Sequence, residues 1–175
     1  MAGFNQIVKF ILRLLFEDET ITIAPCNGSR YIAKEEKVFK AGINSNFKNW
    51  GLEKAGSSTD AVSVSIHKTT NHATFVQMFS SLGSDLNKLC LTQHQIVEYW
   101  EKHCDKLRQD GFVTFFLFKE EENFFVGSVV LSLDGLYVGV CRFEIGGVWK
   151  SERTHRVITP KLAHLHGKPL DPLSL

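Results

Sequence analysis

One segment constrains the fold more than any other, residues 112–119, because almost every side chain in it is apolar. In a β-strand, successive side chains point to opposite faces of the sheet. The apolar side chains divide between the two faces, with Phe112, Phe116 and Phe118 on one and Val113, Phe115 and Leu117 on the other. Since neither face suits contact with water, we expect other elements to cover both sides of this strand.

The sequence after this strand predicts an antiparallel β-meander. A polar reversal at 120–123 and the pair Asp134-Gly135, a strong two-residue hairpin signal, bound two further apolar runs, 124–133 and 136–143. The chain breaks at Gly146-Gly147, and residues 153–159 then have the composition of another strand. We therefore expect a meander of about four strands in the C-terminal region.

Residues 61–111 are predicted to form one strand followed by helices. Residues 61–67 alternate between apolar and polar side chains, which is typical of a half-exposed strand. One helix is expected between Asn71 and Gly83. Thr92 and Gln95 have the spacing of a capping box, in which each side chain bonds a free backbone amide at the start of a helix. These helices are the expected cover for one face of the meander.

The N-terminal region predicts an amphipathic helix over residues 4–16 and then a β-hairpin. Apolar side chains recur at helical spacing in the first segment, with Lys9 and Arg13 off the apolar stripe. Two roles stay open for this helix: it docks on the protein's own core, or it is presented to a membrane surface or a partner. The hairpin would join residues 20–24 to 30–33 through an Asn-Gly turn.

Together these patterns predict an α+β fold. A C-terminal antiparallel β-meander would pack against the central helices, with the N-terminal helix and β-hairpin joined to the same body. A chain of 175 residues has the length of a single domain. We assign residues 1–162 to that domain, in three parts (1–60, 61–111 and 112–162), and residues 163–175 to a proline-containing tail.

Composition narrows the class of protein. Twenty basic and nineteen acidic residues, spread evenly, provide no basic arm for nucleic acid. No apolar run approaches the roughly 20 residues that span a bilayer, so we expect no membrane span. The four cysteines contain no Cys-x-x-Cys pair, which favours free thiols and a cytoplasmic protein.

Motifs for chemistry are absent from the chain. It contains no phosphate loop, dinucleotide fingerprint, nucleophile elbow or zinc-protease helix. We therefore predict no cofactor, assign no catalytic residue and do not favour an enzyme. Cys90 and His94 are four residues apart, but a thiolate needs a base within hydrogen-bond reach, and the helix start at Thr92 lies between them. A buried thiol and a surface histidine are the simpler interpretation.

Histidines are the candidates for metal binding. His67 and His72 flank a predicted strand-to-helix junction, and His164 and His166 lie in the tail. No carboxylate or cysteine stands nearby to complete a ligand set for either pair. We predict no metal site.

The most distinctive polar cluster follows Trp149. On a strand, Arg153 and His155 would share one face, and Thr154 and Arg156 the other. An open face with two cations beside Trp149 could hold a phosphate or carboxylate. The simpler interpretation is an edge strand whose charges prevent pairing with another sheet. We predict Trp149, Arg153, His155 and Arg156 as the candidate ligand-binding residues.

Several short segments carry a resemblance to known sequences. They are Ala24-Pro-Cys-Asn-Gly28, Asn46-Phe-Lys-Asn-Trp-Gly51, Phe79-Ser-Ser-Leu-Gly83, Asp85-Leu86, Leu89-Cys-Leu-Thr-Gln-His-Gln-Ile96, Asp110-Gly111, Thr114-Phe-Phe-Leu-Phe-Lys119 and His155-Arg-Val-Ile-Thr-Pro160. On these segments, over residues 20–162, the chain resembles a family of small uncharacterised bacterial proteins of unknown function. The resemblance implies a bacterial, cytoplasmic setting, and it brings no activity, cofactor or catalytic residue.

The function favoured by the sequence is a non-enzymatic protein-binding or regulatory module, which acts on a protein partner or forms a homo-oligomer. The alternative is a small-ligand protein or enzyme that binds an anion in a pocket between sheet and helices. Nucleic-acid binding is a weaker alternative. Fourteen Phe and three Trp could stack on bases, but they lack interleaved basic residues.

Overall fold

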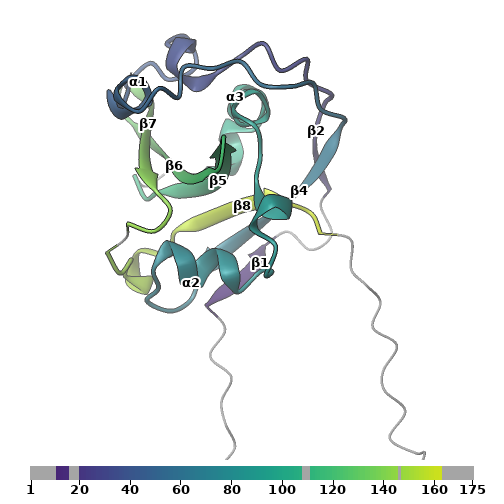
Figure 1. Cartoon of the computed structure of the whole chain (residues 1–175). Coiled ribbons are helices and arrows are strands. Elements are labelled where there is room, and N and C mark those ends of the chain that lie inside the picture. Colours follow the sequence, from purple (N-terminus) through teal and green to yellow (C-terminus); the bar gives the residue numbers. More distant parts are fainter. Residues whose placement is uncertain (1–10, 16–19, 108–110, 146, 163–175) are drawn as a thin grey trace, which may run out of the picture.

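The computed structural model describes residues 11–15, 20–107, 111–145 and 147–162, which form one eight-stranded mixed sheet (Figure 1). The strands are β1 (Leu12–Leu15), β2 (Ile21–Ile23), β3 (Gly42–Ile43), β4 (Val62–Thr69), β5 (Thr114–Glu120), β6 (Asn123–Ser132), β7 (Gly135–Arg142) and β8 (Arg156–Pro160). Three α-helices lie in this part of the chain, α1 (Asn46–Asn49), α2 (Phe75–Ser80) and α3 (Gln93–Lys102). None of the helices in the described ranges is long and apolar enough to cross a lipid bilayer.

Strands from all regions of the chain alternate in the sheet. Their order is β1-β4-β8-β5-β6-β7-β3, and β2 pairs with the other half of β4. Most neighbouring strands are antiparallel, whereas β8 runs parallel to β5 and β3 runs parallel to β7. Parallel neighbours need a long crossover. Between β5 and β8 the chain supplies it by forming the β6–β7 hairpin first.

The predicted α+β arrangement, a C-terminal meander packed against central helices, is wrong. The antiparallel meander has three strands, β5 to β7, and β8 lies on the other side of β5, between it and β4. Three successive residues of β8, Val157, Ile158 and Thr159, are buried, as in a strand covered on both faces. An apolar run identifies such an internal strand but does not identify its neighbours, which explains the error.

The predicted N-terminal elements are also wrong where the structure describes them. Residues 12–15 form β1 rather than a helix, because pairing with β4 places Leu12 in the core. Residues 4–10 and 16 of that predicted helix, and the tail 163–175, lie outside the described residues. The predicted hairpin does not form, since β2 pairs with β4 and Ile32–Lys34 makes a 3-10 turn.

The predicted strand and helices of the central region form, but the prediction that the helices share one face of the meander is wrong, because α3 and α2 belong to cores on opposite faces. The alternating segment 61–67 corresponds to β4, and the two expected helices are α2 and α3. The capping box closes as predicted: the Gln95 backbone N–H donates to Thr92 Oγ1 (3.2 Å), and the Thr92 N–H donates to Gln95 Oε1 (2.9 Å).

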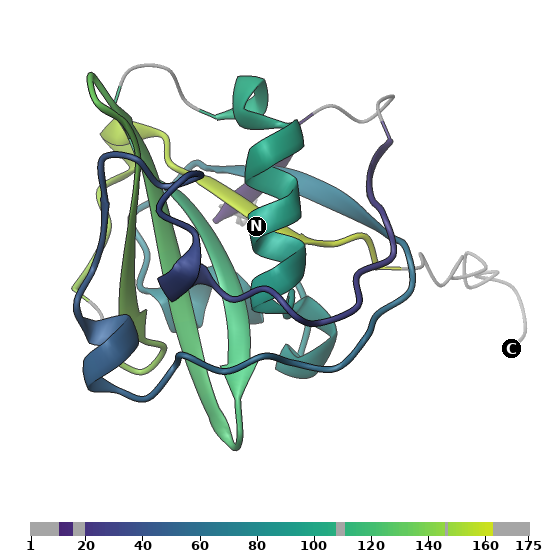
Figure 2. The same cartoon turned by 90° about the horizontal axis from the view of Figure 1, so that it is seen from above.

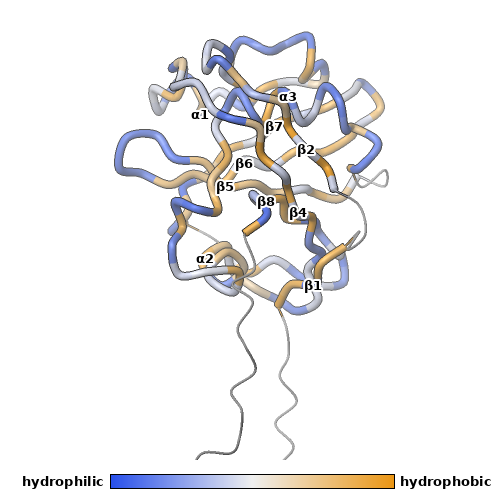
Figure 3. The backbone as a smooth tube through the Cα atoms, turned by 90° about the vertical axis from the view of Figure 1, so that its right-hand side faces the viewer, coloured by the Kyte–Doolittle hydropathy of each residue, from blue (hydrophilic) through white to orange (hydrophobic). Residues whose placement is uncertain are grey.

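Both faces of β5 are covered, as its sequence predicts. On one face, Phe116 and Phe118 belong to a core that includes Trp100 of α3. On the other, Phe115 and Leu117 belong to a second core with the buried side chains of α2. Figure 2 shows α3 between the sheet and the extended segment of residues 20–60. In Figure 3 the central strands are mostly hydrophobic and the outer connections mostly hydrophilic.

Close packing of β6 on β5 generates the first prediction. Gly127 lies opposite Phe116, and a Cβ on Gly127 would stand 2.1 Å from the Phe116 ring. We predict that Gly127→Ala lowers the free energy of unfolding by about 1–3 kcal/mol, the usual cost of overpacking, in urea denaturation. Gly147→Ala is the matched control, because no atom would lie within 4 Å of its Cβ. Equal stability of the two variants would contradict this packing.

Candidate functional site

The predicted ligand-binding cluster does not occupy one strand face. Arg153 is exposed on a 3-10 turn, and Thr154 adopts a left-handed conformation (φ 46°) before β8 begins at Arg156. The Arg156 guanidinium donates a hydrogen bond to the backbone carbonyl of Lys106. The geometric premise that Arg153 and His155 stand side by side on a strand is therefore wrong.

Trp149 and His155 do meet, as part of an aromatic packing cluster. His155 is only 1% exposed, and its ring centre lies 5.1 Å from that of Trp149 and 5.4 Å from that of Phe115. Its Nδ1 accepts a hydrogen bond from the backbone N–H of Val113 (3.3 Å). These contacts explain a structural role for both residues, and anion binding by the cluster stays a prediction.

A different site, missed from the sequence, lies at the N-terminus of α3. It is a cavity of about 370 Å³ between the helix, the end of β5 and two loops. The lining residues are Gly28, Lys54, Gly56, Ser57, Asn87, Cys90, Leu91, Thr92, Gln93, His94, Lys119 and Glu120. Since they come from four separate segments, no contiguous motif marks the site. The one signal in the sequence is the capping box that starts α3.

The first turn of α3 supplies free hydrogen-bond donors. The backbone N–H groups of Gln93 and His94 make no hydrogen bond to any residue in the described ranges. N–H groups at a helix start carry the positive end of the helix dipole. Because both residues line the cavity, this end of it favours an anionic or hydrogen-bond-accepting group.

Gln93 joins this end of α3 to three other segments. Its side chain is 4% exposed, and its Oε1 accepts from the backbone N–H of Ile32 (3.1 Å). Its Nε2 donates to the Leu52 carbonyl (2.8 Å) and to Glu120 Oε1 (2.7 Å). The side-chain amide of Gln93 thus forms its hydrogen bonds within the protein. We infer that Gln93 holds the cavity wall in place.

Two lysines and one glutamate determine the charge of the cavity. With Lys54 and Lys119 against Glu120, and neutral histidine, the lining has two positive charges and one negative, a net charge of +1. Lys54 Nζ lies 2.5 Å from Glu121, and Lys119 Nζ lies 3.4 Å from Glu122. Both of these partner carboxylates are exposed to solvent. Because exposed ion pairs contribute little free energy, an anion could replace these carboxylates at small cost.

One wall of the cavity is backbone, formed where Gly28 crosses Gly56. The Gly56 N–H donates to the Gly28 carbonyl (2.9 Å), and Gly28 has a φ of +79°. A Cβ on Gly28 would lie 2.3 Å from the Gly56 oxygen, so only glycine allows this approach. Cys26 and Thr59 exchange two further backbone hydrogen bonds (3.0 and 2.8 Å) and hold the two loops together.

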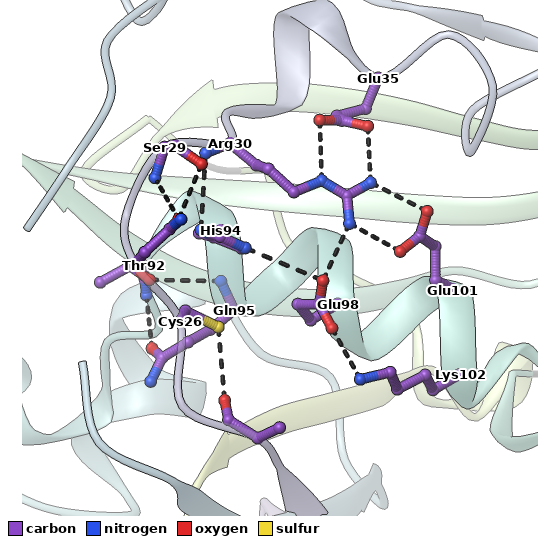
Figure 4. Close-up of polar contacts among 12 residues, drawn as sticks. Cys26, Ser29, Arg30, Glu35, Thr92, His94, Gln95, Glu98, Glu101 and Lys102 are labelled. Carbon is purple, nitrogen blue, oxygen red and sulfur yellow. Dashed lines mark hydrogen bonds and ion pairs between the residues drawn. The ribbon is translucent and has the colours of Figure 1, made fainter. Parts of the chain in front are cut away.

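Beside the cavity, Arg30 ties the covering segment to α3 (Figure 4). Its guanidinium donates to Glu35 (2.9 and 2.7 Å), Glu98 (2.9 Å) and Glu101 (2.6 and 2.9 Å). Hydrogen bonds from Arg30 lower the pKa of Glu101, and those from Lys102 and Arg30 lower the pKa of Glu98. The cluster fixes the loop that carries Gly28.

His94 lies next to this cluster and lines the cavity. Its Nδ1 accepts from the Arg30 backbone N–H (3.5 Å), and its Nε2 lies 3.8 Å from Glu98 Oε1 (Figure 4). Burial lowers the pKa of His94, so the ring is neutral at pH 7. A neutral ring adds polarity to the cavity without adding charge.

Cys90 also lines the cavity but does not supply a nucleophile. Its Sγ donates to the Leu86 carbonyl (3.3 Å), and burial raises the pKa of the thiol to about 12. The thiol therefore stays protonated at neutral pH, and the thiolate that a cysteine–histidine pair requires is not formed. All four cysteines are free.

One of the histidines considered for metal binding, His72, has a partner within the protein. Nδ1 of His72 contacts the backbone N–H of Ser151 (3.0 Å), while His164 and His166 lie outside the described residues. Within the described ranges, no three His, Cys, Asp or Glu side chains are grouped so that they could hold a metal ion.

Three exposed apolar side chains lie on two neighbouring segments elsewhere on the surface. They are Val76 on α2 and Ile145 and Val148 after β7, which are 42%, 67% and 62% exposed. The two segments are joined by paired hydrogen bonds between Ala73 and Trp149 (2.9 and 3.2 Å), and Figure 1 shows them side by side. We call these three residues the apolar patch.

Comparisons with protein-family models, with curated proteins and with solved structures find no match for this chain. They therefore support no family assignment, including the resemblance described above. The functional interpretation depends on the geometry of the molecule.

The Arg30 cluster generates the second prediction. We predict that Arg30→Met lowers the free energy of unfolding by about 2 kcal/mol at pH 7, because the partly buried Glu35 and Glu98 and the exposed Glu101 lose a charged partner. The pKa values of Glu98 and Glu101 are lowered in the folded state. The stabilisation by Arg30 is therefore present above the pKa of an unfolded glutamate, about 4.3. It is lost as the pH falls through the lower pKa values that the two glutamates have in the folded protein.

Urea denaturation at pH 7 and at about pH 3.5 measures this effect. The difference between wild type and Arg30→Met should shrink at the lower pH. Arg153→Met, at an exposed arginine, is the matched control, with an expected change within about 0.5 kcal/mol. A difference for Arg30→Met that does not depend on pH would contradict the assignment.

Proposed function

We propose that the protein binds a small anionic molecule, a carboxylate or phosphate of metabolite size, in the cavity at the N-terminus of α3. One observation carries the proposal: two lysines and two free backbone N–H groups border the same space of about 370 Å³. This volume lies in the range of small-molecule sites, which combine a concave shape with a few convergent polar groups. Anion binding is also the alternative function that the sequence indicates. The present proposal keeps that function but assigns it to the residues that line the α3 cavity.

Binding would follow from the exchange of weak contacts for stronger ones. Lys54 and Lys119 give up exposed carboxylates and form charge-assisted hydrogen bonds to a ligand less accessible to water. The first turn of α3 adds hydrogen-bond donors, and their use costs little conformational entropy. The capping box and the Gln93 side chain already hold this turn in place. We propose binding without catalysis, since the Cys90 thiol is protonated and the Gln93 amide is occupied.

A cytoplasmic location remains part of the proposal. Its support is that the four cysteines are free thiols, as expected in a reducing compartment.

The lysines generate the third prediction. Isothermal calorimetry measures the binding of three anions to the protein: inorganic phosphate, glycerol phosphate and succinate. Glycerol and succinamide are titrated into the protein in the same way, as uncharged analogues. We predict that only anions bind, that affinity falls with added salt, and that Lys54→Met and Lys119→Met each weaken binding about tenfold. Lys37→Met, at an exposed lysine outside the cavity, is the matched control. Equal binding of the uncharged analogues, or unchanged affinity in both cavity variants, would contradict the proposal.

The apolar patch favours a second function, the protein-binding role indicated by the sequence. Exposed clusters of large apolar side chains are typical of protein-interaction surfaces. In its simplest form the partner is a second copy of this chain, which would match the patch to itself across a two-fold axis.

Self-association is the fourth prediction. We expect the sedimentation coefficient of the wild type to rise with concentration, and the double variant Ile145→Asp/Val148→Asp to abolish that rise, because buried charge is costly. Leu133→Asp, at the exposed β6–β7 turn, is the control. A wild type that stays monomeric at all concentrations would contradict the homo-oligomer.

A further inference from the structure

A second cavity lies on the opposite face of the sheet from α3. Its volume is about 250 Å³, and it sits between β1, β4, the end of β8 and the turn after α2. Its lining residues are Leu14, Ser65, His67, Ser81, Leu82, Thr159, Pro160, Lys161 and Leu162. At about 30 Å³ each, roughly eight water molecules would fill this space, which is enough for a small organic molecule.

The floor of this cavity is polar where the rest of the face is apolar. Val64 and Ile66 of β4 belong to the core on the α3 side, so Ser65 and His67 point to the α2 side. Ser65 pairs directly with Thr159 across the β4–β8 ladder. Opposed residues in such a ladder have Cβ atoms about 5 Å apart, so the two hydroxyls and the His67 ring form one polar cluster.

The hydrogen-bonding capacity of these polar side chains is not filled by the described residues. Thr159 is only 2% exposed and Ser65 is half-buried, and neither hydroxyl makes a hydrogen bond to a described residue. Nδ1 of His67 is buried and also lacks a hydrogen-bond partner there. Buried polar atoms are normally bonded, and leaving one unsatisfied costs about 1–3 kcal/mol. One buried unsatisfied nitrogen and two hydroxyls without a hydrogen bond to a described residue therefore border the same cavity, and a molecule bound there would complete them.

The remaining lining residues restrict the chemistry of that molecule. Lys161 is the single charged residue of the lining, so it favours one negative charge. Leu14, Leu82 and Leu162 offer an apolar wall for a short hydrocarbon chain. Burial lowers the pKa of His67, partly opposed by the backbone of Val157, so the ring is neutral and does not add a second cation.

We propose that this cavity is a second ligand site, which binds a short-chain monocarboxylate. The carboxylate contacts Lys161 and the hydroxyls of Ser65 and Thr159, the His67 ring adds a hydrogen bond, and the alkyl chain lies against the leucines. The site is independent of the anion site at α3, because the two cavities share no lining residue.

Sodium butyrate is the probe, with butyramide as the uncharged analogue and inorganic sulfate as an anion without an alkyl chain. Titrations of the full-length chain are followed by the backbone amide and histidine ring signals in NMR spectra. We expect butyrate to shift the signals of residues 65–67, 81–82 and 159–162 with a dissociation constant on the order of 1 mM, whether or not it also shifts residues 54–57 at the anion site of α3. Butyramide and sulfate should bind at least about tenfold more weakly.

Two conservative variants separate binding from folding. Thr159→Val keeps the shape and Lys161→Met keeps the length of the side chain, and each should weaken butyrate at least about fivefold while the remaining spectrum stays unchanged. Thr22→Val, at an exposed threonine on β2, is the control. The proposal is overturned if butyrate shifts no signal around the cavity, because the cavity then holds water only. It is also overturned if both variants bind butyrate as tightly as the wild type. Shifts confined to the α3 cavity would also overturn it, and they would instead support the proposed function.

Discussion

Burial of both faces of β5 is the constraint on which the architecture depends. Fully burying a phenylalanine contributes about 1.5–3 kcal/mol, and this strand carries Phe115, Phe116 and Phe118, all close to fully buried. One helical layer could cover only one face, so α3 and α2 pack on opposite sides. β8 then fills the place beside β5 and joins it to β4, which shields the edge that a three-stranded meander would leave open.

The candidate site is a consequence of how α3 is anchored on that sheet. Its first turn cannot be buried in the apolar core, because free N–H groups need polar partners. The capping box satisfies the Gln95 N–H, the Gln93 side chain joins the helix start to Ile32, Leu52 and Glu120, and the remaining N–H groups face a polar space. The Arg30 cluster holds the covering loop against the same helix. The polar space left between these anchors is the cavity, and its lysines give it a preference for anions.

Local patterns in the sequence predicted the local structure well. The alternation at 61–67, the capping box at Thr92 and the Asp134-Gly135 hairpin all describe interactions between residues close in the chain. Pairing between distant segments was not predictable in this way. An apolar segment such as residues 12–15 has similar spacing in a helix and in an edge strand, and only contact with β4 decides between them. The site depends wholly on such distant contacts, so its residues were missed, whereas Arg153 and His155 were grouped by a strand that starts after them.

Native mass spectrometry of freshly purified protein, compared with its denatured mass, tests the central claim that this chain binds a small anion. The account predicts a non-covalent adduct of metabolite mass on the wild type, which disappears on denaturation. The adduct should also be absent from the double variant Lys54→Met/Lys119→Met, purified in the same way and equally folded. A bare mass for the wild type, or an adduct that both lysine substitutions leave in place, would contradict the account.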